Sequence, residues 1–381
     1  MRRPSLVVVP TDPVEAYSAK GNAGGRADYY NPTGVFKEWA IGSPWHLRGG
    51  EWQGHTVAGV AGGRLGGYLR QVRPDAVRAY GGHWPATLAR AAAPTGVRVV
   101  ASLHDSAPGL FGPGLAGCDR VFAVSPTVAE LAQAAGVDAH RIRLIPNRVD
   151  TTRFAPDSAP SGGPVPPSIL FVGRLTRQKN LETLLAALAQ LPPEFTLTVV
   201  GLGDRAPYER IAASLGVASR VAWHPSVANE ALPALYQAHG IFATPSRWEG
   251  FGIVFLEAAA CGCAIVAPAV APVDGLLTDG ANARLVPPED PTAWASAIRD
   301  MRAEPSLTQA LRVAARARAL EFDRGLIDAR EAEAYRELLA ESAREFSVSD
   351  RRALRPHSLR AEARLLVKGL IRRQLRLGPG V

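Results

Sequence analysis

Two glutamates, Glu249 and Glu257, lie on either side of a glycine turn that follows a short apolar run ending at Thr244. The turn contains Gly250, Phe251, Gly252 and Ile253. Glycines allow the backbone to turn tightly, and the first N–H groups of a following helix attract an anion. Carboxylates on either side of an anion site can hold opposite ends of a phosphorylated ligand. On these residues alone, a plain turn with two solvated glutamates is the alternative.

Two cations follow another predicted strand. Arg174 and Lys179 come directly after the apolar residues 168–172 and before a helical stretch. At the carboxyl end of a strand, an arginine fork and a lysine point charge suit a diphosphate. Gly173 precedes this pair, and Gly203 belongs to a glycine turn on the same expected edge. Solvated cations on a surface loop are the alternative.

The first half of the chain offers His104, which ends a predicted strand and precedes Asp105. A single histidine is most simply a hydrogen-bonded polar residue. Two glycine pairs could approach ligand phosphates, Gly24 with Gly25 and Gly81 with Gly82. No His/Asp cluster has metal-ligand spacing, so the residues indicate no metal. Nothing marks a lysine that would hold pyridoxal phosphate, and we expect no cofactor.

These residues sit in a repeated alternation of β-branched runs and Ala/Leu-rich stretches, which predicts parallel strands joined by crossover helices. Strands are expected at 5–9, 76–80, 97–103, 120–124 and 141–145, then at 168–172, 196–200, 220–224, 240–244 and 264–267. Helices are expected at 85–93, 126–135, 180–190, 208–215, 232–239, 254–260, 291–301 and 306–342. The fold class is therefore α/β, and its nearly continuous apolar strands are typical of sheets covered on both faces.

The two alternations are separated by residues 155–167, which hold five prolines and two adjacent glycines. A length of 381 residues also exceeds what one core usually supports. We expect a first domain over 1–154, a linker over 155–167 and a second domain over 168–320. The remaining parts are a helix over 321–345 that packs back on the first domain and a tail over 346–381.

Composition excludes several classes of protein. With 47% apolar and 20% charged residues, the chain is not disordered, collagen-like or a coiled coil. Three cysteines argue against a disulfide scaffold and fit a reducing compartment. No run has the ~20 strongly apolar residues of a membrane span, and the apolar start ends too early, at Pro10, for a signal peptide. We expect a cytoplasmic protein.

The positive charge is concentrated in the tail. The whole chain carries +8, of which residues 346–381 carry +7, so the body is not expected to bind nucleic acid. On a helix, one side of this tail would be basic and the other apolar. The basic set is Arg360, Arg364, Lys368, Arg372 and Arg376, and the apolar set is Leu359, Ala363, Leu366, Leu370 and Leu377. Such a helix could lie on an anionic membrane or pack on the first domain.

Aromatic residues gather in the first domain, where they could form a platform for a sugar or pack in the core. They are Tyr29, Tyr30, Trp39, Trp45, Trp52, Tyr80 and Trp84. Core packing is the favoured interpretation.

Between about residues 97 and 300, these segments resemble the family 4 retaining glycosyltransferases, also described as glycosyl transferases group 1. Glu249 and Glu257 around Gly-Phe-Gly match the family's Glu-x7-Glu pattern. Gly173-Arg174-Leu175 with Lys179 matches its Gly-Arg-Leu…Lys motif. The segments 145–150 and 260–267 look like two further family motifs, although Arg148 replaces a glycine and 270–274 lacks the Gly-Gly-x-x-Glu loop.

The resemblance implies a GT-B fold, with two Rossmann-like domains whose parallel sheets face each other across a cleft. The first domain would bind a carbohydrate or lipid-linked acceptor, and the second a nucleotide-diphosphate sugar. A hexose would be transferred with retention and without a metal, for cell envelope polysaccharide synthesis. The enzyme would be cytoplasmic, with its tail on the inner face of the cell membrane. The alternatives are a non-catalytic nucleotide-sugar-binding subunit that partners another transferase and a sugar-nucleotide epimerase.

The resemblance also assigns roles to the residues. Arg174 and Lys179 would bind the diphosphate and stabilise its departing charge, and Glu257 would bind the ribose. Glu249, together with the N–H groups of the glycine turn, would hold the transferred sugar. His104 would reach that sugar from the first domain, and Asp105 would orient His104 or the acceptor. The donor set is completed by Gly173, Gly203, Gly250, Phe251, Gly252 and Ile253.

Overall fold

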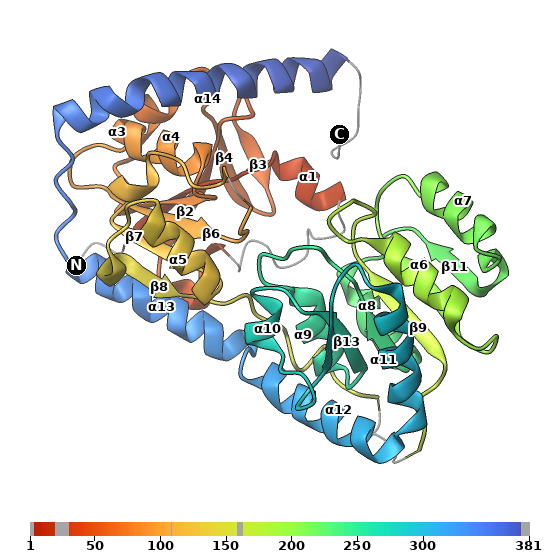
Figure 1. Cartoon of the computed structure of the whole chain (residues 1–381). Helices are drawn as coiled ribbons and strands as arrows, with labels where there is room; N and C mark the ends of the chain where they lie inside the picture. Colours follow the sequence, from red (N-terminus) through yellow and green to blue (C-terminus); the bar gives the residue numbers. More distant parts are fainter. Residues whose placement is uncertain (1–3, 20–29, 108, 158–162, 375–381) are drawn as a thin grey trace. The chain divides into compact units, whose positions relative to one another are not determined.

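The computed structural model describes residues 4–19, 30–107, 109–157 and 163–374 (Figure 1). The chain divides into two compact units. Unit 1 comprises residues 1–146 and 328–381, and unit 2 comprises residues 147–327. Each is an α/β unit built around a largely parallel sheet, as the strand pattern predicts. The chain enters unit 2 at Asn147, before the linker expected at 155–167, of which residues 158–162 lie outside the described residues.

In the described part of unit 1, eight strands form one sheet in the order β3-β4-β2-β1-β5-β6-β7-β8. The strands are β1 Ser5–Val9, β2 Glu38–Ser43, β3 Gly50–Trp52, β4 His55–Gly59, β5 Ala76–Tyr80, β6 Arg98–Leu103, β7 Arg120–Ala123 and β8 Ile142–Leu144. All neighbours are parallel except β3 and β4. The five strands expected here are confirmed. The sequence did not indicate β2, β3 and β4, which are partly exposed and lack a continuous apolar run.

The helices of unit 1 are α1 Val14–Ala19, α3 Leu65–Val72, α4 Trp84–Ala92, α5 Pro126–Ala134 and α14 Val348–Gln374, with most of α13 Arg324–Ala340. Helix α5 begins as its sequence predicts: Ser125 accepts a hydrogen bond from Val128 N, and Pro126 occupies the first turn.

Helix α13 is fastened to unit 1 by a buried ion pair between Glu331 and Arg78 of β5. Arg78 Nε also donates to Ser102 Oγ at 2.8 Å. Beside this pair, Tyr335 of α13 packs edge-on against Phe36 and Phe122. The second segment of unit 1 thus completes a core that begins more than 250 residues earlier in the chain.

Unit 2 has a six-stranded, fully parallel sheet in the order β11-β10-β9-β12-β13-β14. The strands are β9 Ser168–Val172, β10 Thr196–Val200, β11 Val221–His224, β12 Ile241–Ala243, β13 Ala264–Pro268 and β14 Arg284–Val286. Its helices are α6 Leu181–Gln190, α7 Ala206–Ser214, α8 Leu232–Ala238, α9 Ile253–Ala260, α10 Val273–Leu276, α11 Pro291–Ala303 and α12 Pro305–Leu320. The expected alternation in this half is confirmed to within two residues at most boundaries.

The single helix expected over 306–342 is wrong, because the chain breaks between α12 and α13. Asp323 accepts hydrogen bonds there from Thr151 Oγ1 at 2.5 Å and from Gly325 N at 2.8 Å. Val149 N also bonds to Phe322 O at 3.0 Å. The bonds to Thr151 and Val149, from a distant segment, and the local bond of Gly325 N replace the i→i−4 bonds of a continuous helix.

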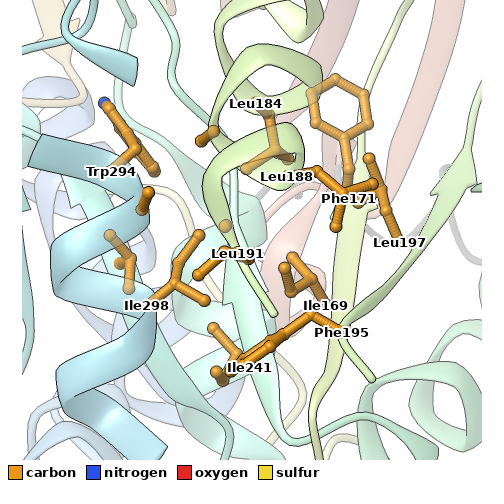
Figure 2. Close-up of a cluster of buried hydrophobic side chains, with 14 of the residues drawn as sticks. Ile169, Phe171, Leu184, Leu188, Leu191, Phe195, Leu197, Ile241, Trp294 and Ile298 are labelled. Atoms are coloured by element: carbon orange, nitrogen blue, oxygen red, sulfur yellow. The ribbon is translucent and has the colours of Figure 1, made fainter. Parts of the chain in front are cut away.

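The core of unit 2 lies between its central strands and helices α6 and α11 (Figure 2). Strand residues Ile169, Phe171, Leu197 and Ile241 face α6 residues Leu184 and Leu188 and α11 residues Trp294 and Ile298. This packing fixes the positions of β9, β10 and β12, and therefore of the loops that leave their carboxyl ends.

The tail forms helix α14, which packs on α4 in unit 1 (Figure 1). Between residues 348 and 368, its buried side chains are Leu354, Ser358, Ala361 and Leu365, spaced by four, three and four residues. The apolar face expected around Leu359 and Leu366 instead remains exposed, at 55% and 36%. Arg376 and Leu377 lie outside the described residues.

Candidate functional site

Three loops meet at the carboxyl edge of the unit 2 sheet, after β9, β10 and β12. Gly173 N donates to Val200 O at 3.0 Å, and Leu175 N donates to Leu202 O at 2.7 Å, so the first two loops are joined by their backbones. A Cβ on Gly201 would lie 1.8 Å from Gly173 O. Gly203 adopts a positive φ of 138° against Leu175. This close approach explains the glycines of the second loop.

Lys179 and Glu249 form an ion pair, with Nζ 2.5 Å from Oε1. Both side chains are largely buried, at 12% and 7% exposure. The sequence motifs that contain them lie 70 residues apart, and the fold brings them together. The cation expected for the phosphate and the carboxylate expected for the sugar are therefore adjacent.

Arg174 differs from Lys179 in its exposure and its partners. Its side chain is exposed, and among the described residues it has no ion-pair or hydrogen-bond partner. An exposed guanidinium and a largely buried lysine on one loop provide two cations with different access to an anionic ligand.

Arg247 organises the loop after β12, a role that sequence reasoning missed. Its guanidinium donates to Arg177 O at 2.6 Å and pairs with Glu182 at 3.0 Å and Glu289 at 2.6 Å. Its backbone N–H also donates to Gln178 O at 2.8 Å. The loop that carries Glu249 is thus fastened to the loop that carries Lys179. A lone arginine in a loop gives no sequence signal for such a role.

Asn180, the residue after Lys179, is fully buried in the left-handed conformation, with φ 54°. Its amide donates to Pro288 O at 2.7 Å, and its Oδ1 accepts from Thr183 Oγ1 at 3.0 Å. These bonds hold the start of α6 and so position the lysine before it.

The glycine turn before α9 has the expected form. Gly252 has φ 88°, and a Cβ there would lie 2.8 Å from the Phe255 ring. Phe251 is buried and contacts Phe322 edge-on at 5.7 Å, whereas Ile253 is exposed. Gly250 links this anchor to Glu249. The turn leads into the amino end of α9, where backbone N–H groups favour negative charge.

Glu257 lies buried in α9, and its Oε2 accepts a hydrogen bond from the hydroxyl of Tyr236, at 2.9 Å. Burial raises the pKa of Glu257 to about 7. Burial and the neighbouring carboxylate raise the pKa of Tyr236 as well. Sequence reasoning missed Tyr236, which resembles any apolar residue of α8. The contact engages one carboxylate oxygen, Oε2.

The candidate residues of unit 1 gather after β5 and β6. The His104 ring stacks on Tyr80 with centroids 5.5 Å apart and planes 6° apart. The Arg78 guanidinium lies 4.6 Å from the centroid of the same tyrosine. Asp105 Oδ1 accepts from Ala107 N at 2.9 Å, which shapes the loop after His104.

Gly81 and Gly82 form a tight turn after β5. A Cβ on Gly82 would lie 2.7 Å from Leu103, and Gly81 has φ 103°, so the chain passes close to the end of β6. Gly24 and Gly25 lie outside the described residues.

The aromatic cluster of unit 1 separates into two groups. Tyr30 contacts Trp39, Trp52 and Tyr80, with ring centroids 5.0–6.4 Å apart. Tyr30, Trp52 and Tyr80 are buried, which confirms core packing for these three, whereas Trp39 is half-buried and stacks on His55. Trp45 and Trp84 form a separate edge-on pair at 6.0 Å. Tyr29 lies outside the described residues.

The described residues contain no group of three or more His, Cys, Asp or Glu side chains placed to hold a metal ion. None of their helices combines the length and apolarity that crossing a membrane requires. Cys118, Cys261 and Cys263 are buried free thiols, as expected.

Family models match both halves of the chain. The model described as Glycosyl transferases group 1 matches residues 162–318, and that described as Glycosyltransferase Family 4 matches residues 51–153. The first match contains all the unit 2 candidates, and the second contains His104 and Gly81.

The relatives reported next are named as glycosyltransferases. A D-inositol 3-phosphate glycosyltransferase of Xylanimonas cellulosilytica is 35% identical over 227 residues, covering 55% of this chain and 54% of the relative. A GDP-mannose-dependent alpha-(1-6)-phosphatidylinositol monomannoside mannosyltransferase of Mycolicibacterium smegmatis is 34% identical over 216 residues, covering 51% and 56%. The chain spans about half the length of the curated relatives it matches.

A solved structure shares the fold over most of the chain. Anabaena HepE in complex with UDP-glucose has a TM-score of 0.68 and 21% identity, covering 87% of this chain and 99% of that one. This likeness is one of fold, and it confirms the expected GT-B class of two α/β units with parallel sheets. With matching models in both halves and this fold, the chain belongs to the group 1 glycosyl transferases, family 4.

Proposed function

We propose that this protein is a retaining glycosyltransferase that moves a hexose from a nucleotide-diphosphate sugar to a carbohydrate or lipid-linked acceptor, without a metal. The observation that carries the proposal is the Lys179–Glu249 ion pair, held beside Arg174 and the glycine turn of α9. The names of the relatives, which include a GDP-mannose-dependent mannosyltransferase, and the UDP-glucose complex of HepE support it.

The diphosphate would bind between Arg174 and Lys179. Arg174 is exposed and can meet the incoming phosphates, whereas Lys179 already neutralises Glu249 at 2.5 Å. A phosphate that draws on Lys179 would weaken this ion pair, and Glu249 could then accept hydrogen bonds from sugar hydroxyls. One buried lysine would thus couple diphosphate binding to sugar binding.

The remaining donor contacts follow from the same edge of the sheet. Glu257 has Oε2 engaged by Tyr236, so Oε1 would accept the ribose hydroxyl. The backbone from Gly250 to Ile253 would face the sugar and phosphate, with Phe251 as its buried anchor. Gly173 and Gly203 carry no side chain, so the backbones of the two loops would leave room for the ligand.

In the reaction, the bond between the anomeric carbon and the diphosphate oxygen breaks, and a bond to the acceptor oxygen forms on the same face. The acceptor's hydroxyl proton passes to the departing diphosphate oxygen, so no enzymic nucleophile is required. Arg174 and Lys179 would stabilise the charge that develops on the diphosphate. His104 would hydrogen-bond the sugar from unit 1.

The test is a donor panel with the full chain. UDP-glucose, UDP-galactose and GDP-mannose are compared by thermal shift, because a true donor at 100 times its Kd stabilises the fold by about 2.7 kcal/mol. Product formation is then followed with a panel of carbohydrate, phosphorylated and lipid-linked acceptors. Fractionation of cells of the source organism would test the proposed cytoplasmic location on the inner face of the membrane.

The control for the panel is Glu209→Gln, on a partly exposed carboxylate of α7 that pairs with Arg205. It should behave as the wild type, whereas Glu249→Gln should bind donor and lose transfer. Donor binding without transfer to any acceptor would favour the non-catalytic subunit, and absence of donor binding would overturn the proposal.

A further inference from the structure

Unit 1 contains a cavity of about 790 Å³ beneath helix α14, within the size range of small-molecule sites. One wall is formed by the loops that follow β1, β2, β5 and β6, represented by Asp12, Trp45, His83 and Gly112. The opposite wall is the middle part of α14, residues 357–368. We call this space the α14 cavity.

The cavity lies at the functional edge of the sheet. Strands β1, β2, β5 and β6 are mutually parallel, and the lining loops all leave their carboxyl ends, where open α/β sheets bind ligands. The loops are joined to one another, since Thr11 Oγ1 donates to Tyr80 O at 2.9 Å and Trp45 Nε1 donates to Thr11 O at 3.2 Å. The wall on this side is therefore fixed before any ligand arrives.

Three cations of α14 line the cavity. They are Arg360, Arg364 and Lys368, which lie on successive turns of the helix. The buried contacts of Ala361 and Leu365 hold this part of the helix in place. Asp12 contributes one carboxylate, so the lining carries a formal charge of +2 with its histidines neutral.

The charge of Lys368 on α14 acts on His83, which lies on the opposite wall of the cavity. Burial lowers the pKa of His83, and the charge of Lys368 lowers it further. His83 therefore stays neutral near pH 7, and the fixed charges of the cavity come from α14 and Asp12. An anion would be drawn to the α14 side.

The cavity also has an aromatic wall. Trp45 and Trp84 both line it and meet edge-on, with planes 85° apart. Aromatic faces pack well against the apolar faces of sugar and polyol rings. Cations on one side and indole rings on the other suit a ligand that combines a ring with a phosphate group.

We propose that the α14 cavity binds the phosphate of a phosphorylated acceptor, with the acceptor's ring against Trp45 and Trp84. The inference rests on the proposed function and specifies its acceptor class. The phosphate belongs either to a soluble phosphosugar or to a lipid headgroup, since both present the same anionic group. The cations of the tail are thus part of a substrate site.

The outward side of α14 suggests a different interaction. Leu359, Leu366 and Val367 are exposed there, at 55%, 36% and 54%. They point away from the buried face and do not line the cavity. Attachment of α14 to a membrane through these residues would not require the cations of the cavity.

The experiment compares two sets of substitutions on the same helix. The cavity variant is Arg360→Ala/Arg364→Ala/Lys368→Ala. The matched control is Arg352→Ala/Arg355→Ala, which removes exposed cations that do not line the cavity. Binding to the full chain is measured with inorganic phosphate, glucose 6-phosphate and neutral glucose. Vesicles of phosphatidylglycerol and of phosphatidylcholine provide the lipid arm.

We expect glucose 6-phosphate to bind the wild type and the control equally, at least tenfold tighter than glucose, and the cavity variant to lose at least tenfold in affinity. If the phosphate is carried by a lipid, phosphatidylglycerol vesicles should show the same dependence instead. Arg364→Lys should retain binding, and circular dichroism of the cavity variant checks its fold. The KM of the cavity variant for the acceptor should rise, while its affinity for nucleotide diphosphate stays unchanged.

Equal binding of every phosphate probe to wild type and cavity variant would overturn the proposal. So would vesicle binding that Leu359→Ser/Leu366→Ser abolishes and the cavity variant preserves. A chain that binds phosphate through α14 but binds no nucleotide sugar would keep the cavity and refute the proposed function. The experiment can therefore refute phosphate binding in the α14 cavity without refuting the proposed glycosyltransferase function, and the reverse.

Discussion

Tyr236 donates its hydroxyl hydrogen to Glu257 Oε2 across 2.9 Å, inside unit 2. The two residues come from neighbouring helices, α8 and α9, and both are buried. The carboxyl group therefore sits where its charged form is poorly solvated, and its protonation should be visible in the stability of the protein.

The first prediction follows from the pKa of Glu257, which burial raises from 4.5 to about 7. Below pH 4.5 the group is protonated in both the folded and the unfolded chain. Between these values only the folded chain holds the proton, so the free energy of unfolding falls as the pH rises. Above about pH 7 the full cost is present, on the order of 3 kcal/mol.

Glu257→Gln should remove this dependence. Urea unfolding of unit 2 is measured at pH 5 and pH 8 for the wild type and the variant, and the difference between them should grow with pH. Glu209→Gln, on the surface, serves as control. Parallel profiles for wild type and Glu257→Gln would show that the carboxyl does not titrate in this range.

The second prediction concerns Glu249. Glu249→Ala should lower turnover at least 100-fold, because the sugar loses its carboxylate partner. The affinity for nucleotide diphosphate should not decrease, since Lys179 is released from its 2.5 Å ion pair and becomes available to phosphate. Steady-state kinetics and calorimetry check the two parts. Transfer at the wild-type rate would remove Glu249 from the site.

The third prediction concerns the two cations. Arg174→Ala and Lys179→Ala should each weaken binding of nucleotide diphosphate by about 1.5–3 kcal/mol, the usual contribution of a charge-assisted hydrogen bond. Arg177 has an exposed side chain on the same loop, and Arg177→Ala should change the affinity for nucleotide diphosphate little. Calorimetry with the free diphosphate measures all three. Equal affinities would place the diphosphate elsewhere.

A fourth prediction concerns the ion pair between Arg78 and Glu331, both 1% exposed. Glu331→Ala leaves a buried guanidinium without its carboxylate partner and should destabilise unit 1 by about 3–5 kcal/mol. Glu333→Ala, on the exposed side of the same helix, should cost less than about 1 kcal/mol. Chemical unfolding followed by tryptophan fluorescence compares the stability of the two variants. Similar losses of stability would contradict the role given to the Arg78–Glu331 pair.

The fifth prediction tests the reaction without a metal. Turnover should survive excess chelator, because the proposed charge stabilisation comes from Arg174 and Lys179. The measurement is initial rate with and without the chelator, followed by addition of magnesium. A loss of activity that magnesium restores would contradict this part of the proposal.

Most of the fold could be predicted because most strands of the two sheets are continuous apolar runs. Ser168–Val172 and Thr196–Val200 agree with the sequence to the residue. The hairpin of β3 and β4 could not be found, because short, exposed strands carry no period-two pattern. The break at Asp323 was also hidden, since its hydrogen-bond partner Thr151 lies 172 residues away.

The sequence indicated the separate parts of the site but not their contacts. Glu249 and Lys179 were expected to hold different parts of a ligand, and their ion pair depends on how two loops pack. Arg247 and Tyr236 act through tertiary contacts that no local pattern encodes. In α14 the helical period predicted two faces, but the face that packs includes Ser358 and Ala361, small residues that fit against α4.

The discontinuity of unit 1 has a consequence for biosynthesis. Unit 2 is one uninterrupted segment, Asn147–Ile327, so it can fold on the ribosome as soon as that segment has emerged. Unit 1 begins first but must wait, because Glu331 and Tyr335, which complete its interior, are translated after all of unit 2. During that interval Arg78 lacks its carboxylate partner. Residues 1–146 of the nascent protein therefore lack part of their interior, and stay accessible to chaperones and proteases, until α13 has been translated.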